Sequence, residues 1–169
     1  EHALHLAEQL NKPMLTGKED LHRGIADLYR EWNKLEQAEQ HLQIATELGQ
    51  QGIMMPDWQH RLNVSWARFK IAIGDYDSAL AHLDAAQMHY MRSPLPLVRP
   101  VSAMKARVWI EQGQLQKAQE WVRRQGLGAN EELSYLKEYE IITLARILLA
   151  QYRIKRTSDS LQSASQLLA

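Results

Sequence analysis

The sequence contains no cysteine among its 169 residues. A chain without cysteine has no disulfide framework and no thiolate metal site, which excludes the small domains that depend on either one. The absence also points to a reducing compartment. At this length the chain matches one ordinary domain and is long enough to bury a hydrophobic core.

An excess of charge of one sign is also missing, because 20 Lys and Arg residues balance 20 Asp and Glu residues. No field therefore extends over the whole surface to gather nucleic acid or an anionic membrane. Uninterrupted apolar runs are only a few residues long, far short of the roughly 20 residues that cross a bilayer. We expect a soluble, cytoplasmic protein whose charged functions are local.

The usual signatures of nucleotide binding, DNA binding and catalysis are absent as well. We find no Gly-rich phosphate loop, no helix-turn-helix at the C-terminus, and no nucleophile elbow around Ser134 or Ser158. Glu131 and Glu132 are adjacent, and adjacent residues on a helix point apart, which is unsuitable for a paired acid and base. The prediction is therefore that the chain is not an enzyme and has no cofactor.

A short pattern recurs four times along the chain. Each copy has a turn-like residue, an apolar residue two positions later and a small residue five positions later. The copies read Asn33-Lys34-Leu35 with Ala38, Gly74-Asp75-Tyr76 with Ala79, Gly113-Gln114-Leu115 with Ala118, and Tyr152-Arg153-Ile154 with Thr157. Their spacings of 41, 39 and 39 residues fall within the range of helical-hairpin repeats.

The residues around each turn fit a helix, a tight turn and a second helix. Seven positions before the turns stand four alanines, Ala26, Ala67, Ala106 and Ala145. Four bulky residues stand nine positions after the turn residues, namely Leu42, Leu83, Val122 and Leu161. Small residues let two helix axes approach, and Gly or Asn tolerates the left-handed backbone of a helix end. The fourth copy departs at Tyr152 and Thr157, so we expect its hairpin to cap the array or to fray.

The sequence thus predicts an all-α chain of about four helical hairpins in a right-handed superhelical solenoid. Breakers such as Pro56 separate the hairpins, and Asp57 and Asn130 are candidate N-caps. The expected helices cover residues 20–32, 35–50, 57–73, 76–91, 98–112, 115–125, 131–151 and 155–168. We expect one domain over residues 1–169, with a partial repeat at 1–15 and repeats at about 20–52, 57–92, 97–126 and 131–168.

Several stretches resemble a known family. The spacing of Ala26, Tyr29, Asn33, Ala38, Leu42 and Ala45 resembles the tetratricopeptide (TPR) consensus with about six extra residues per repeat. Four longer stretches are similar to the repeat region of MalT-like, LuxR-type bacterial transcription regulators. They are Leu28–Ala38 (LYREWNKLEQA), Ala106–Gly113 (ARVWIEQG), Glu132–Glu140 (ELSYLKEYE) and Thr143–Ala150 (TLARILLA). The resemblance covers nearly the whole chain.

That family combines an N-terminal nucleotide-binding switch, a helical-repeat sensor and a C-terminal helix-turn-helix. The resemblance implies that this chain is the sensor and that it binds a small effector or a protein partner. It also implies that the flanking nucleotide-binding and helix-turn-helix domains are its partners within a parent protein. The resemblance further implies that the parent protein self-associates in an ATP-dependent way. A different hypothesis is a free-standing TPR-like scaffold that holds a peptide in its concave groove and has no transcriptional role.

Histidines and tryptophans suggest two further kinds of site, and neither is favoured. His82 and His89 could share a helix face, as could His2 and His5, but no third metal ligand lies nearby. Tryptophans could form an aromatic platform for sugars or bases, but at helical spacing they are more often core residues. The candidates for this platform are Trp66, Trp109 and Trp121.

One polar pattern does follow the repeat. The residue after each first-helix alanine faces the concave groove in TPR-like units, and three of these residues are arginines. The row consists of Asp27, Arg68, Arg107 and Arg146, with Arg61 and Arg30 flanking it. Planar guanidinium groups bind phosphate, carboxylate or an acidic peptide, so the row predicts an anion-binding groove. The alternative is internal pairing with acidic residues, namely Glu31, Glu111, Glu138 or Glu140.

The two ends of the array carry a separate expectation. Ala3, Leu6 and Leu10 already keep helical spacing at the start of the chain. An array that begins and stops between repeats leaves apolar side chains uncovered at its ends. The residues expected to be exposed are Leu4 and Leu161, together with Leu167 or Leu168.

Overall fold

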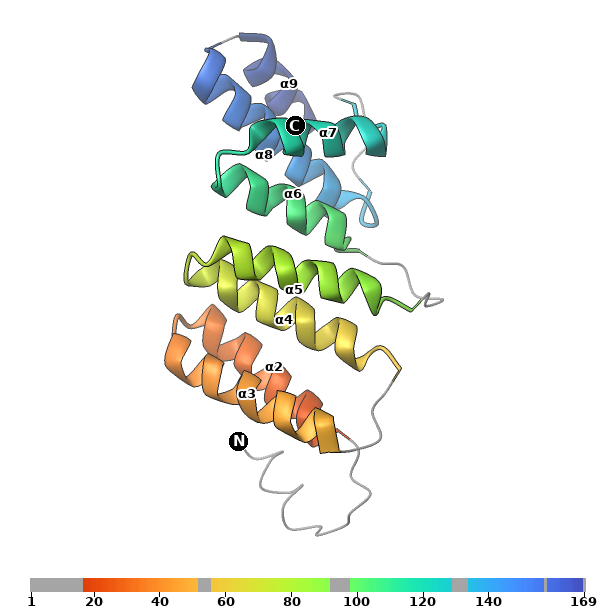
Figure 1. Ribbon diagram of the computed structural model, residues 1–169. Helices are drawn as coiled ribbons and strands as arrows, with labels where there is room; N and C mark the ends of the chain where they lie inside the picture. Colours follow the sequence, from red (N-terminus) through yellow and green to blue (C-terminus); the bar gives the residue numbers. More distant parts are fainter. Residues whose placement is uncertain (1–16, 52–55, 92–97, 129–133, 157, 169) are drawn as a thin grey trace. The chain divides into compact units, whose positions relative to one another are not determined.

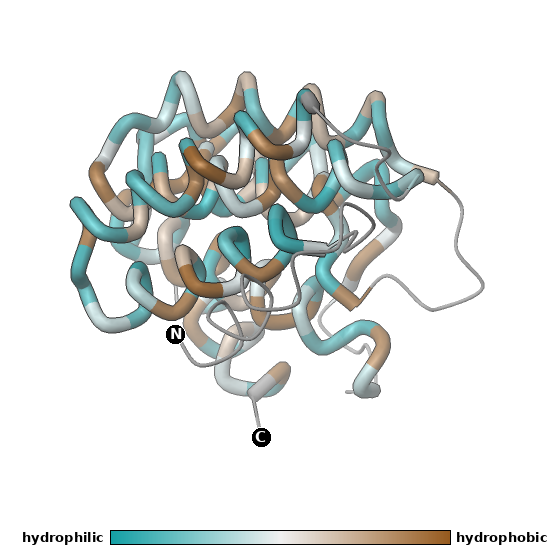
Figure 2. Tube along the Cα trace, turned by 90° about the horizontal axis from the view of Figure 1, so that it is seen from below, coloured by the Kyte–Doolittle hydropathy of each residue, from teal (hydrophilic) through white to brown (hydrophobic). Residues whose placement is uncertain are grey.

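A computed structural model describes residues 17–51, 56–91, 98–128, 134–156 and 158–168 of the chain (Figure 1). Within these ranges the chain forms eight helices and no strand, which confirms the all-α prediction. Hydrophobic and hydrophilic stretches are mixed over the helical turns (Figure 2), as expected for helices that bury one side. None of the described helices is long and apolar enough to span a membrane.

The helices form two compact units, Glu1–Met91 and Arg92–Ala169. The first unit contains α2 (Lys18–Glu31), α3 (Leu35–Gln51), α4 (Trp58–Ala72) and α5 (Tyr76–Met88). The second unit contains α6 (Val101–Glu111), α7 (Leu115–Gln125), α8 (Glu138–Lys155) and α9 (Ser158–Leu168). Successive helices pack as the pairs α2 with α3, α4 with α5, α6 with α7 and α8 with α9. These pairs confirm the TPR-like hairpins, while the single domain and the superhelical solenoid stay predictions.

Three hairpin turns lie where the sequence pattern predicts them. Asn33, Gly74 and Gly113 have φ values of 55°, 77° and 72°, in the left-handed region. At the first turn the Asn33 N–H donates to the Arg30 carbonyl, and the next N–H donates to the carbonyl of Tyr29. The other two turns repeat this pair of hydrogen bonds. All three helices therefore end in a Schellman motif, which satisfies carbonyl groups that a helix end leaves unpaired.

The fourth turn differs from its predicted position. Residues 152–154 continue α8, and the left-handed residue is Arg156, with a φ of 55°. At the repeat position of Asn33, Gly74 and Gly113 the chain has Tyr152, whose Cβ would be strained in a left-handed backbone. Helix α8 therefore continues to Lys155, and Arg156 is its C-cap. Thr157, the predicted small-residue position of this copy, lies outside the described residues.

The four alanines predicted to lie at helix crossings are buried. Ala26, Ala67, Ala106 and Ala145 are at most 2% exposed. Of the bulky positions, Leu42 and Leu83 are fully buried, Val122 is partly buried and Leu161 is 40% exposed. The cores therefore form around close helix contacts, and the pattern weakens in the last hairpin.

Helices α6, α8 and α9 begin at least three residues later than their sequence pattern suggests. Pro100 is the N-cap of α6, and its carbonyl accepts hydrogen bonds from the N–H groups of Ala103 and Met104. Proline has a fixed φ and no N–H, which favours a helix start directly after it. Residues 134–137 form turns before α8 begins at Glu138. The predicted N-cap Asp57 precedes α4 but makes no side-chain capping hydrogen bond, and Asn130 lies outside the described residues.

The expectation for the chain ends is met in part. Leu161 is exposed, whereas Leu167 is 5% exposed and packs with Ile141 and Leu144 in a small core. Leu4 and the side chain of Leu168 lie outside the described residues, as does the partial repeat predicted at 1–15. The last hairpin thus covers part of its own apolar surface.

Candidate functional site

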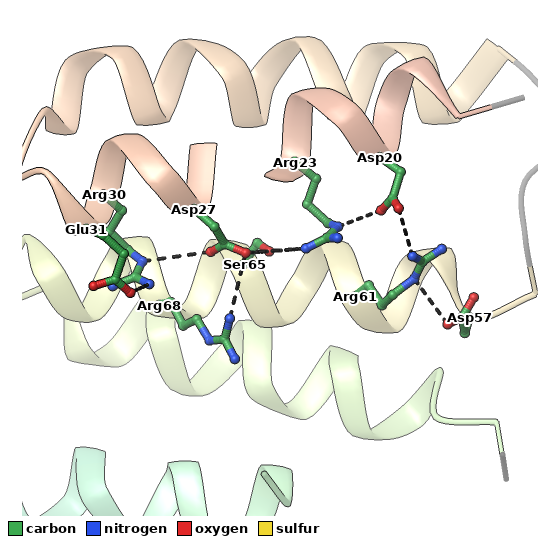
Figure 3. Close-up of polar contacts among 9 residues, drawn as sticks. All are labelled: Asp20, Arg23, Asp27, Arg30, Glu31, Asp57, Arg61, Ser65 and Arg68. Carbon is green, nitrogen blue, oxygen red and sulfur yellow. Dashed lines mark hydrogen bonds and ion pairs between the residues drawn. The ribbon is translucent and has the colours of Figure 1, made fainter. Parts of the chain in front are cut away.

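In the first unit, Asp27 lies at the centre of a polar network between α2 and α4 (Figure 3). Its Oδ2 atom is 3.3 Å from Arg23 Nη1 and 3.7 Å from Arg68 Nη1. The Ser65 hydroxyl also donates to Oδ2, over 3.2 Å. On the other side, Asp27 Oδ1 is 3.8 Å from Arg30 Nε, and Arg30 also pairs with the neighbouring carboxylate of Glu31.

A second set of ion pairs lies further towards the start of α2. Asp20 accepts a hydrogen bond of 2.7 Å from Arg23 Nε and one of 2.9 Å from Arg61 Nη1. Arg61 Nε is also 3.1 Å from Asp57 Oδ2. Burial alone would raise the pKa of Asp20, but its hydrogen bonds to Arg23 and Arg61 and their positive charges outweigh that effect and lower it. Asp20 therefore stays ionised and joins α2 to α4.

These contacts place four of the six residues predicted for the anion groove. Arg30, Arg61 and Arg68 each lie beside a carboxylate of the same unit, and Asp27 is one of those carboxylates. This is the internal pairing considered as the alternative, and of the acidic partners expected from the sequence only Glu31 takes part in the first unit. The sequence analysis missed Asp20 and Arg23, although residues 20, 23, 27 and 30 follow the helical i, i+3, i+4 spacing of one face.

In the second unit, Arg107 and Arg146 line the same cavity, which has a volume of about 240 Å³. They extend from α6 and α8, which pack against each other. The rest of the lining consists of Ile110, Glu111, Leu149, Ala150 and Arg153. On each helix these residues follow the spacing of a single face, so the cavity lies along the contact between two first helices of neighbouring hairpins.

Neutral groups hold Arg107 in place. Its Nε donates to Thr143 Oγ1 over 2.8 Å, and its Nη2 donates to the carbonyl of Tyr139 over 3.2 Å. The guanidinium also lies 3.6 Å from the centre of the Tyr139 ring. Thr143 is fully buried and donates its hydroxyl hydrogen to the same carbonyl over 2.6 Å. Arg107 is thus fixed by two hydrogen bonds and one ring face before any ligand arrives.

The electrostatic surroundings of Arg107 are unfavourable for its charge. Burial is the main cause that lowers its pKa, and the positive charges of Arg146 and Arg99 lower it further, while Tyr139 acts in the opposite direction. Within the described part of the chain, no carboxylate forms an ion pair with Arg107, Arg146 or Arg153. The second unit therefore presents cationic groups that have no anionic partner there.

The three tryptophans considered for an aromatic platform belong to the cores of the two units. Trp121 is 4% exposed, and Trp109 packs against the same core cluster of the second unit. Trp66 packs against the core of the first unit and donates its ring N–H to Thr46 Oγ1 over 3.1 Å. A larger, open cavity of about 470 Å³ in the first unit is lined by uncharged or histidine side chains, including Trp66, His82 and His89. Among the described residues, no group of three potential ligands could hold a metal ion.

Comparison with known proteins adds one match. The family described as the MalT-like TPR region matches residues 1–169. No curated protein matches the chain, and no solved structure matches it. The family match spans the whole chain, and it agrees with the resemblance that the repeat residues carry.

Proposed function

The chain belongs to the family of MalT-like TPR regions, and we propose that it is the sensor region of a LuxR-type transcription regulator. In this proposal it binds a small effector or a protein partner and thereby controls an ATP-dependent switch in the same regulator. The flanking nucleotide-binding and helix-turn-helix domains are then its partners, and self-association follows from the switch. A regulator of this kind acts on the chromosome, so we place it in the cytoplasm. TPR-type repeat regions are generally non-catalytic, and the proposed activity is binding.

The observation that carries the proposal is the cationic cavity between α6 and α8. Arg107 and Arg146 line it, and no described carboxylate forms an ion pair with either of them. Arg107 is half-buried. A half-buried cation without an anionic partner lowers the stability of the fold, so its presence in a cavity favours a ligand-binding role. In the first unit, Arg61 and Arg68 are already engaged with Asp20 and Asp27. We assign that network to holding α2 against α4, and we assign ligand binding to the second unit.

A sensor acts through differential affinity. An effector changes the state of the regulator only if it binds one conformation more tightly than the other. A cavity between two helices suits this purpose because a small change in the packing of α6 against α8 changes the distance between Arg107 and Arg146. The ligand then stabilises the arrangement in which both guanidinium groups reach it.

The proposal can be tested by thermal unfolding of the whole chain in the presence of compounds from different classes. Sugars, sugar phosphates, organic acids and acidic peptides provide a sufficient range. A ligand that binds only the folded state at 100 times its Kd adds about 2.7 kcal/mol of stability. We expect at least one class of small molecule to raise the melting midpoint. Binding of acidic peptides alone would support the free-standing scaffold instead, and no binding by any class would contradict both.

A further inference from the structure

We infer that the cavity between α6 and α8 binds the phosphate group of a small phosphate monoester. The inference rests on the proposed sensor function and names the chemical class of its effector. It depends on three properties of the cavity: the hydrogen-bond donors that remain available, the excess of positive charge, and the size and polarity of the lining.

The first property is the set of donors on Arg107. The hydrogen bonds to Thr143 and Tyr139 use N–H groups on Nε and Nη2. No described group accepts a hydrogen bond from Nη1, so both of its N–H groups remain for a ligand. The stacking on Tyr139 and the bond to Thr143 fix the guanidinium plane, so little side-chain freedom is lost on binding. Arg107 is therefore prepared to donate up to two charge-assisted hydrogen bonds from Nη1 to an oxyanion.

The second property is charge. Arg107, Arg146 and Arg153 line the cavity together with a single acidic residue, Glu111. The lining therefore has an excess of two positive charges, which a dianion neutralises. A phosphate monoester carries about −1.5 to −2 charges near pH 7, whereas a carboxylate carries only one. The charge balance thus favours phosphate over a monocarboxylate.

The third property is the shape of the lining. A volume of about 240 Å³ is below the range of roughly 300–1,000 Å³ that is typical of drug-sized ligands. Ile110, Leu149 and Ala150 supply an apolar surface beside the arginines, on which a short carbon skeleton can lie. Glu111 stands one turn after Arg107 on α6. Its carboxylate can accept hydrogen bonds from hydroxyl groups of the ligand and would repel a second anionic group.

Titration calorimetry of the whole chain at low salt tests this inference, with glycerol 3-phosphate as the probe. Glycerate, in which a carboxylate replaces the phosphorylated CH2OH group, and glycerol are the matched ligands. We expect glycerol 3-phosphate to bind, glycerate to bind at least tenfold more weakly and glycerol to give no signal. Arg107→Gln and Arg146→Gln should each weaken binding of glycerol 3-phosphate at least tenfold, because each removes a charge-assisted hydrogen bond.

Arg124→Gln is the matched control. Arg124 lies on α7 of the same unit, its side chain is 75% exposed, and it pairs with Glu120 away from the cavity lining. The substitution removes the same charge and should leave binding unchanged. Arg146 is also exposed, so Arg146→Gln should fold even if Arg107→Gln does not. Circular dichroism checks folding of each variant.

The inference is overturned if glycerol 3-phosphate does not bind, or if the two cavity variants bind it as tightly as the wild type does. It is also overturned if Arg124→Gln weakens binding as much as Arg107→Gln, since that result indicates attraction to overall charge alone. Its failure differs from failure of the proposed function. A neutral effector that still changes nucleotide affinity in the complete regulator leaves the sensor function intact. Phosphate binding without any effect on nucleotide affinity contradicts the sensor function alone.

Discussion

Arginine side chains lie on the first helix of hairpins in both units, and their surroundings differ. Arg68 lies beside Asp27, whereas Arg107 is held by a hydroxyl, a carbonyl and an aromatic ring. An arginine that is already paired with a carboxylate has fewer donors left for a ligand, and one that is positioned by neutral groups keeps its full charge available. The partner of each arginine, more than its position in the repeat, thus decides its role.

Replacing Asp27 by Asn tests the structural role of the first network. The substitution removes the negative charge shared by Arg23, Arg30 and Arg68, while the side chain keeps its size. Because Asp27 is only 22% exposed, we expect the free energy of unfolding to fall by about 1–3 kcal/mol. Glu31→Gln is the control, since that side chain is 67% exposed and its loss should cost less than about 0.5 kcal/mol. Equal effects in urea unfolding would argue against the network.

The pH dependence of stability depends in part on His82. Burial, and secondly the charge of Lys70, lowers the pKa of His82 below its ordinary value of 6.5, while Asp75 acts in the opposite direction. The Nδ1–H group of the neutral ring donates to Asn63 Oδ1 over 2.9 Å, and the ring stacks on Trp66. The unfolded chain therefore binds more protons near pH 6, so this residue makes stability fall as pH drops below its unfolded pKa.

His82→Gln should therefore flatten the loss of stability between about pH 7 and pH 5. Urea unfolding at a series of pH values measures the slopes for both proteins. The other histidines remain in the variant, so the difference between the two slopes reports on His82. A variant that loses stability as steeply as the wild type would show that His82 does not titrate as expected.

At the scale of the helix hairpin, the sequence was most informative where the backbone restricts the choice of residue. Left-handed turns need Gly or Asn, and helix crossings need Ala, so both could be read from a single sequence. Arg156 carries no such signal, and the end of α8 was not predictable. Ion pairs between side chains on different helices could not be predicted from the sequence either. The register of α2 against α4, which brings Arg61 to Asp20, depends on packing that no local pattern records.

Ala106→Leu tests the close contact of α6 with its neighbours. Ala106 is fully buried and belongs to a core cluster with Ala118, Trp121 and Ile147. A larger side chain should overpack this crossing and cost about 1–3 kcal/mol. Gln116→Leu, at an exposed position of α7, is the matched control and should change stability by less than about 0.5 kcal/mol. A melting midpoint that is the same in Ala106→Leu and in the wild type would mean that the repeat register is wrong.

At the scale of the whole molecule, the sequence repeat made the helical hairpins predictable, but it predicted the candidate site only in part. Arg68, Arg107 and Arg146 occupy the same position in successive repeats, so the sequence predicts the same role for all three. In the structure, Arg107 and Arg146 meet at one cavity of the second unit, while Arg68 pairs within the first unit. The difference arises from Asp27, which replaces an arginine at the first copy of this position. One continuous row along the inner face stays a prediction.

The central claim is that ligand binding at Arg107 and Arg146 controls a nucleotide-dependent switch. The most direct test is the affinity of the complete regulator for ATP, measured with and without glycerol 3-phosphate, in the wild type and in Arg107→Gln. Because coupling between two sites is reciprocal, the phosphate ligand should change the Kd for ATP by about five- to 150-fold in the wild type and by the same factor in the reverse experiment. Arg107→Gln should lose this change while it still binds ATP. An ATP affinity that does not respond to the ligand in the wild type would contradict the account.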